Sequence, residues 1–134
     1  MCQAHAYLEA ELGATRVGTI GWCFGGGWSL QAALMLPGEI DATVIFYGHL
    51  ETGRDALAAI AAPVLGIFGA EDGGIPVATV REFESTLRDL GKDVRIHVYE
   101  GADHAFANPS GGNYAEAAAD AWAKTLAFFA ETLR

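Results

Sequence analysis

The sequence predicts an α/β fold in which a mostly parallel sheet of about four strands is flanked by helices. Short runs of β-branched and apolar residues recur along the chain, at residues 16–20, 42–47, 64–68 and 94–99. Helical stretches separate and follow these runs, at residues 2–12, 24–35, 77–90 and 114–133. The two middle runs are apolar at successive positions rather than alternating ones, which is typical of strands covered on both faces of a parallel sheet.

Side-chain spacing supports the two longer helices. Val80, Phe83, Leu87 and Leu90 recur at steps of three and four, so they share one face, and Gly91 is expected to end that helix. Trp122, Leu126 and Phe129 have the same spacing in the last helix, and we expect them to form its packing face. The turn-forming run at residues 108–113 predicts a loop before that helix.

The bulk composition fits one folded domain, residues 1–134, and excludes several partners. A net charge of −9 repels phosphate backbones and anionic lipid surfaces, so neither nucleic acid nor a membrane is an expected partner. The chain has no apolar stretch of spanning length and no export signal at its start, which favours the cytoplasm. Two cysteines, Cys2 and Cys23, are too few for a disulfide scaffold.

The most informative segment is a predicted strand that runs into the glycine-flanked Cys23 and then into a helix. Gly21 and Gly25 stand two residues before and two after Cys23, which is the G-x-C-x-G pattern of a nucleophile elbow. Small residues at these positions are expected to keep the strained turn free of clashes. A thiol at a helix N-terminus is easier to ionise, and the backbone amide of Phe24 would face a developing oxyanion.

Four other interpretations of the segment around Cys23 are possible, and two of them lack a required residue. A dinucleotide-binding loop starting at Gly21 requires glycine where Cys23 stands, and a phosphate-binding loop requires lysine where Gly27 stands, so both fail. Cys23 as a small buried apolar residue is a third interpretation. A thiol-based redox sensor is a fourth, although no second cysteine adjoins Cys23 in the sequence.

An acid and a histidine follow later strands, in the chain order of α/β-hydrolases. Asp72 follows the strand at 64–68, and His104 follows the strand at 94–99, so both belong to the edge of the sheet where α/β proteins build their sites. The alternatives are that Asp72 only caps the turn, or that Glu71 is the acid. Among the other histidines, His5 and His97 are less suitable than His104, whereas His49 follows the strand at 42–47 and remains a second choice.

These motifs resemble the dienelactone hydrolase family, a branch of the α/β-hydrolases that uses cysteine, aspartate and histidine. The similarity runs from about residue 16 to the C-terminus, through the segments at 21–26, 46–48, 69–76 and 97–109. The resemblance implies hydrolysis of small esters or lactones with no cofactor and no metal. It also implies Cys23 as nucleophile, Asp72 as orienting carboxylate and His104 as base, with Trp22, Tyr47, His49 and Phe106 as possible pocket residues.

The chain resembles only the C-terminal half of a family domain, a truncated α/β-hydrolase fold. The resemblance implies that the first strands, a second oxyanion amide, a glutamate and an arginine would lie before the elbow. Glu9, Glu11 and Arg16 do not match those family positions. The strand at 16–20 would then be an open apolar edge, which invites another strand. We therefore expect a homodimer or pairing with a separate N-terminal half, and the alternative function is a non-catalytic subunit.

Overall fold

The computed structural model describes residues 2–110 and 114–134 of the chain. Strands and helices alternate along most of it, as the sequence predicted. In chain order the elements are α1 (Cys2–Leu12), β1 (Gly18–Trp22), α2 (Phe24–Met35), β2 (Ala42–Phe46), α3 (Arg54–Leu57), β3 (Val64–Gly69), α4 (Val77–Asp89), β4 (Val94–Tyr99) and α5 (Ala115–Thr132). Residues 111–113 of the predicted loop lie outside the described residues.

The four strands form one fully parallel sheet in the order β1-β2-β3-β4, which confirms the predicted fold class. The predicted first strand, residues 16–20, is wrong by two residues, since β1 begins at Gly18. Residues 16 and 17, which precede β1, are held by a side chain rather than by strand pairing. The Asp41 carboxylate accepts hydrogen bonds from the Val17 amide at 2.7 Å and from Arg16 at 3.1 Å. Within the described residues β1 has β2 as its only strand neighbour.

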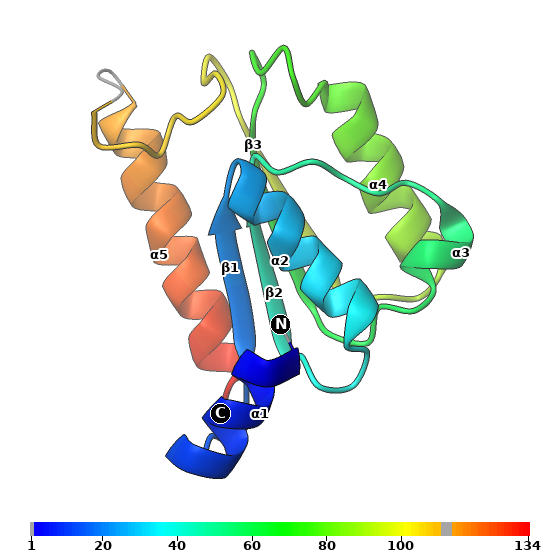
Figure 1. Cartoon of the computed structure of the whole chain (residues 1–134). Coiled ribbons are helices and arrows are strands. Elements are labelled where there is room, and N and C mark those ends of the chain that lie inside the picture. The colour runs from blue at the N-terminus through cyan, green and yellow to red at the C-terminus, as the bar shows by residue number, and fades with distance from the viewer. Residues whose placement is uncertain (1, 111–113) are drawn as a thin grey trace.

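Helices cover both faces of the sheet, and successive strand residues point to alternate faces. One core joins Ile45 and Phe68 to Leu30 of α2 and to α3 and α4. The opposite core joins Val44 and Leu65 to Ala121 and Phe128 of α5. Figure 1 shows this arrangement, with α5 on one side of the sheet and α2 and α4 on the other. The apolar runs of β2 and β3 follow from this double cover, because every residue of both strands is buried.

The predicted packing face is right for α4, whereas in α5 it is right for Phe129, which packs against the core, and wrong for the other two residues. Val80, Phe83 and Leu87 are fully buried, and Gly91 follows the helix with a φ of 72°. In α5 the buried residues are Ala121, Thr125 and Phe128, whereas Trp122 and Leu126 are about half exposed. The periodicity gave the spacing of an amphipathic helix, but the face that meets the sheet is shifted by one residue. The sequence also gave no signal for α3, since four residues are too few for periodicity.

Candidate active site

Cys23 occupies a strained turn between β1 and α2. Its φ of 54° and ψ of −119° lie outside the regions that non-glycine residues favour. Three backbone hydrogen bonds hold it there: its amide donates to the Phe46 carbonyl at 2.9 Å, and its own carbonyl accepts from the amides of Gly26 at 3.0 Å and Gly27 at 3.3 Å. The surrounding structure therefore fixes a conformation that presents the side chain at the protein surface, where the thiol is free and exposed.

The two glycines of the elbow are not equivalent. A Cβ added at Gly21 would lie 2.0 Å from the carbonyl oxygen of Gly25, so only glycine fits there. A Cβ added at Gly25 would meet nothing within 4 Å. The sequence-based expectation that both glycines prevent clashes is therefore right for Gly21 and wrong for Gly25. It is the backbone of Gly25 that lies close to Gly21, whereas the space around a Cβ at Gly25 is open.

Three side chains from three loops form a hydrogen-bonded line. Cys23 Sγ lies 3.0 Å from His104 Nε2, and His104 Nδ1 lies 2.7 Å from Asp72 Oδ2. The other carboxylate oxygen of Asp72 accepts hydrogen bonds from the amides of Gly74 at 2.8 Å and Ile75 at 3.0 Å. The Asp72 side chain is completely buried, whereas 41% of the His104 side chain is exposed. The acid is thus fixed inside the protein, and the imidazole links it to an accessible thiol.

The sheet explains why residues so far apart in the sequence converge. β1, β3 and β4 run parallel, so the loops that follow them emerge at the same edge. Cys23 follows β1, Asp72 follows β3 and His104 follows β4. Tyr47, which follows β2, lies against His104 with a distance of 5.3 Å between ring centroids. The segment after each of the four strands therefore places one residue at this edge of the sheet.

The hydrogen bonds of the line shift the pKa values of Cys23 and His104 in opposite directions. The hydrogen bond from His104 lowers the pKa of the Cys23 thiol, and the Phe24 backbone amide lowers it further against the opposing effect of burial. The hydrogen bonds to Cys23 and Asp72 raise the pKa of His104. Both shifts stabilise a thiolate beside an imidazolium. Burial, together with the nearby Cys23, raises the pKa of Tyr47 to about 12, so its phenol stays protonated at neutral pH.

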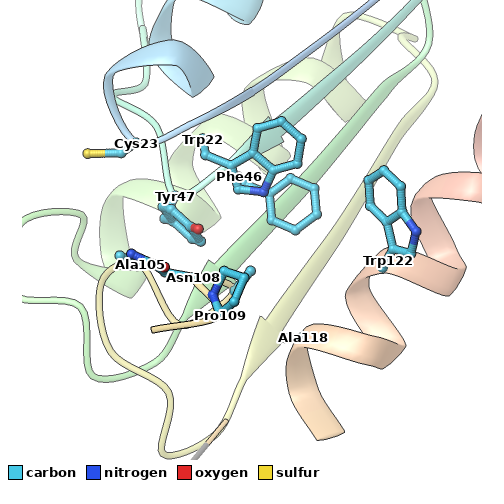
Figure 2. Close-up of a pocket in the computed structure, with 10 residues that line it drawn as sticks. Trp22, Cys23, Phe46, Tyr47, Ala105, Asn108, Pro109, Ala118 and Trp122 are labelled. Carbon is cyan, nitrogen blue, oxygen red and sulfur yellow. The ribbon is translucent and has the colours of Figure 1, made fainter. Parts of the chain in front are cut away.

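A cavity of about 480 Å³ opens beside Cys23. Figure 2 shows that β1, β2, the loop after β4, and α5 contribute its walls, which are mainly aromatic and small apolar side chains. The lining residues are Trp22, Cys23, Phe46, Tyr47, Ala105, Ala107, Asn108, Pro109, Ala118 and Trp122. Among the described residues the non-glycine positions with positive φ are Cys23, Tyr47 and Ala105, and all three line this cavity. Backbone strain is thus concentrated around one site.

The structure separates the predicted pocket residues into two groups. Trp22 and Tyr47 line the cavity. His49 lies outside it, in a smaller hollow against α2 that Phe24 and Trp28 also line. Phe106 is 2% exposed and belongs to the core beneath the cavity, where its ring packs against Tyr47 at 5.6 Å between centroids. His49 and Phe106 are therefore placed away from the cavity that adjoins Cys23.

Sequence reasoning missed Trp122, which reaches the cavity from α5. It also missed Ala105, because neither its identity nor its neighbours predict a φ of 63°. The competing acid, Glu71, is exposed and outside the hydrogen-bonded line. The competing histidines are also elsewhere: His5 is hydrogen-bonded to the Glu39 carbonyl at 2.7 Å, and His97 lies within β4.

No cluster of three or more histidine, cysteine, aspartate or glutamate side chains in the described part of the chain is arranged to hold a metal ion. No helix in residues 2–110 or 114–134 combines the length and the apolar character needed to cross a bilayer.

Comparison with known proteins places these observations in a family. The model of the dienelactone hydrolase family matches residues 3–133. The chain is 35% identical over 127 residues to a "Putative carboxymethylenebutenolidase" of Saccharolobus solfataricus, covering 94% of this chain and 48% of the relative. It is 35% identical over 141 residues to a protein of the same name from Synechocystis, covering 98% and 56%. The chain thus spans about half the length of these relatives.

Solved structures agree with the sequence comparison. The structure of a "Putative Dienelactone Hydrolase" from Klebsiella pneumoniae superposes with a TM-score of 0.74 at 35% identity, covering 83% of this chain and 50% of that one. A dienelactone hydrolase-like promiscuous phosphotriesterase from metagenomic libraries gives a TM-score of 0.78 at 27% identity, covering 88% and 53%. From its sequence, its parallel sheet and these matches, we conclude that the chain belongs to the dienelactone hydrolase family.

Proposed function

We propose that this chain hydrolyses small esters or lactones through an acyl-enzyme on Cys23, with His104 as the base and Asp72 as the orienting acid. Its family membership supports a hydrolase of this class. The observation that carries the residue assignment is the hydrogen-bonded line from the Cys23 sulfur through His104 to a buried Asp72 carboxylate. No metal or organic cofactor takes part in the proposed reaction.

In the first half-reaction the Cys23 sulfur attacks the carbonyl carbon of the ester. The thiol proton passes to His104 Nε2, which lies 3.0 Å from the sulfur. The tetrahedral intermediate collapses when its carbon–oxygen bond breaks, and Nε2 returns the proton to the leaving alkoxide. With a lactone the leaving alkoxide remains part of the acyl group. In both cases the product is a thioester on Cys23.

In the second half-reaction water attacks the thioester carbonyl and gives its proton to His104 Nε2. The carbon–sulfur bond breaks, the carboxylic acid departs and the thiolate is restored. Asp72 keeps the Nδ1 proton of His104 in place, so Nε2 faces the reacting atoms with its lone pair. The two backbone amides on the other Asp72 oxygen hold the carboxylate in this orientation.

The Phe24 amide is the proposed oxyanion donor. It immediately follows Cys23 at the start of α2, and it already lowers the pKa of the thiol. A second donor is expected in this mechanism, and losing one donor costs about a hundredfold to a thousandfold in turnover. We propose that a partner of this chain supplies the second amide.

We further propose that the chain functions as an assembly, either with a second copy or with a separate N-terminal half. Large apolar side chains are exposed on and next to β1 and along α2, which is costly for an isolated chain. They include Trp22, Phe24, Trp28 and Met35, and Phe24 is 79% exposed. The alternative function is a non-catalytic subunit of such an assembly. Because the chemistry requires a reduced thiol, we place the protein in a reducing compartment such as the cytoplasm.

Intact mass spectrometry during reaction with para-nitrophenyl acetate tests the catalytic proposal. We expect a burst of nitrophenolate and a mass gain of one acetyl group that maps to Cys23. The matched control is Cys2→Ala, which removes the other free cysteine and should leave both signals unchanged. Turnover that survives Cys23→Ala would overturn the mechanism, and the absence of both burst and adduct in the wild type would favour the non-catalytic subunit.

Sedimentation velocity of the purified chain tests the assembly. We expect a dimer, or a monomer that precipitates or unfolds readily unless an N-terminal half is supplied. A stable, well-folded monomer at micromolar concentration would contradict this part of the proposal.

A further inference from the structure

The turn that follows β2 contacts both the proposed nucleophile and the proposed base. The Phe46 carbonyl accepts the backbone hydrogen bond from Cys23 at 2.9 Å. The next residue, Tyr47, packs its ring against the His104 imidazole, with 5.3 Å between centroids and an interplanar angle of 63°. Figure 2 shows Tyr47 between Cys23 and Ala105 on the cavity wall. One short segment therefore touches the two residues whose side chains must meet.

Contacts other than the one with His104 fix the position of Tyr47. Its ring packs edge-on against Phe106 and Phe46, with 5.6 and 6.0 Å between centroids, and only 3% of the residue is exposed. Its amide donates to the Ile67 carbonyl at 2.7 Å, and its φ is 36°. A tyrosine in this left-handed conformation is strained, and such strain persists only where the surrounding structure imposes it. The fold therefore places this ring, and His104 meets a surface that is already in position.

The hydrogen bonds of His104 leave one motion of its ring open. The bond from Nδ1 to Asp72 holds that nitrogen, but the ring can still turn about this bond and swing Nε2 away from the Cys23 sulfur. A neutral thiol is a weak hydrogen-bond donor, so it holds Nε2 poorly by itself. The His104 side chain is 41% exposed, and Tyr47 is the one aromatic ring that packs against it in the described part of the chain.

We propose that Tyr47 is a positioning residue, whose ring blocks the rotation of His104 that would turn Nε2 away from the Cys23 sulfur. The contact joins two rings, so the ring rather than the hydroxyl carries the effect. Tyr47 and Phe106 are 3% and 2% exposed, so this packing is made inside the chain and an added strand or subunit does not replace it. The inference rests on the proposed function where it concerns acylation, but the geometry that it explains can be measured without an ester.

The nitrophenolate burst from para-nitrophenyl acetate, measured with enzyme in excess, tests the effect on acylation. Tyr47→Leu removes the ring, and we expect the burst to slow about tenfold to a hundredfold because Nε2 is no longer held against the sulfur. Tyr47→Phe keeps the ring contact and should stay within about threefold of the wild-type rate. If Tyr47→Phe is as slow as Tyr47→Leu, the hydroxyl rather than the ring is responsible and the proposal is wrong.

Phe128→Leu is the matched control for the loss of a buried ring. Phe128 is 2% exposed in the same core, and its ring packs against Phe129 on α5 rather than against His104. This variant should lower the thermal unfolding temperature about as much as Tyr47→Leu does, while the burst stays near the wild-type rate. Equal slowing of the burst in both variants would show a general effect of lost packing and overturn the proposal.

The pH midpoint of Cys23 alkylation by iodoacetamide separates positioning from packing. The titratable groups that act on the thiol within the described residues are His104, Asp72 and the Tyr47 phenol, and Tyr47→Phe removes the phenol alone. In a Cys2→Ala background Tyr47→Leu should raise the midpoint towards that of His104→Ala, because a turned imidazole no longer stabilises the thiolate.

The two other variants should leave the alkylation midpoint in place, since Tyr47→Phe keeps the ring and Phe128→Leu lies outside the site. An unchanged midpoint in a folded Tyr47→Leu would contradict the proposal. If Tyr47→Leu does not fold, carbon relaxation of the His104 ring in the wild-type protein decides instead. We expect a ring as ordered as the backbone of the buried strands, and a ring that turns freely would overturn the assignment.

The outcomes distinguish this proposal from the proposed function. If esters acylate Cys23 but Tyr47→Leu changes neither the burst nor the alkylation midpoint, the hydrolase proposal stands and the positioning role is wrong. If no ester forms an adduct on Cys23 while the midpoint rises in Tyr47→Leu, the proposed hydrolysis fails and Tyr47 still orients His104 towards the thiol.

Discussion

Asp72 and His104 are joined by a hydrogen bond of 2.7 Å between a carboxylate that is completely buried and an imidazole that is partly exposed. The backbone amides of Gly74 and Ile75 hold the second carboxylate oxygen. The carboxylate therefore has a fixed orientation before any substrate binds, and it fixes the ring position and the tautomer of His104. Such preorganisation costs nothing at the moment of reaction.

Asp72→Asn should abolish most activity while it preserves the fold. The amide oxygen of asparagine can still accept from the Gly74 and Ile75 backbone, so we expect little change in thermal unfolding. Its NH₂ group would face His104 Nδ1 and force the proton onto Nε2, which could then no longer accept the thiol proton. We expect turnover of para-nitrophenyl acetate to fall about a thousandfold to ten-thousandfold, measured by steady-state kinetics.

The control for this variant is Glu71→Gln, the adjacent acid and the alternative that the sequence left open. Glu71 is exposed and outside the hydrogen-bonded line, so this variant should keep wild-type turnover. A large loss of turnover in Glu71→Gln with little loss in Asp72→Asn would reverse the assignment of the acid.

The two elbow glycines should respond in opposite directions to the same substitution. Gly21→Ala places a Cβ 2.0 Å from the Gly25 carbonyl oxygen, and we expect the free energy of unfolding to fall by about 1 to 3 kcal/mol or more. The Cβ of Gly25→Ala meets nothing within 4 Å, and alanine favours the helix more than glycine does. We therefore expect the free energy of unfolding to rise by about 0.5 to 1 kcal/mol. Urea unfolding measures both, and equal destabilisation would show that the elbow has another geometry.

The order of strands and helices and the convergence of Cys23, Asp72 and His104 were predictable because they depend on local signals. Glycine spacing marks the elbow, and parallel strands bring the loops that follow them to one edge. The family membership was predictable from the same motifs, and the match of the family model to residues 3–133 confirms it. The catalytic roles of the three residues stay predictions that the variants above test.

The features that the sequence did not predict depend on tertiary context. Periodicity gives the spacing of apolar residues on α5 but not which face meets the sheet, so Trp122 was assigned to packing and is half exposed. Tyr47 and Ala105 adopt positive φ although neither is glycine or asparagine, and only the surrounding structure imposes that conformation. The start of β1 was misplaced because the Asp41 carboxylate, distant in sequence, holds Arg16 and Val17.

The different placements of Phe106 and His49 lead to a further pair of variants. Phe106 is buried between Tyr47 and Tyr99, with ring centroids 5.6 and 5.2 Å away, so Phe106→Ala should lower the free energy of unfolding by about 3 to 5 kcal/mol. His49 is exposed outside the cavity, and His49→Ala should change neither stability nor acylation. Urea unfolding and the nitrophenolate burst measure the two effects. A slower burst in His49→Ala would return His49 to the site.

The lowered pKa of Cys23 predicts thiol reactivity at a pH where an ordinary cysteine is protonated. Its main cause is the hydrogen bond from His104, so the thiolate should persist as the pH falls until it passes the lowered pKa. In a Cys2→Ala background, where only Cys23 can react, the rate of iodoacetamide alkylation should therefore have a midpoint below that of free cysteine. His104→Ala removes the hydrogen bond, so the pKa should rise and the midpoint should move to higher pH. His97→Ala, a change within β4 away from the thiol, should leave the midpoint in place.

Mass spectrometry of the alkylated protein gives the rate at each pH. A midpoint that is the same with and without the His104 imidazole would show that the thiolate does not depend on this pair.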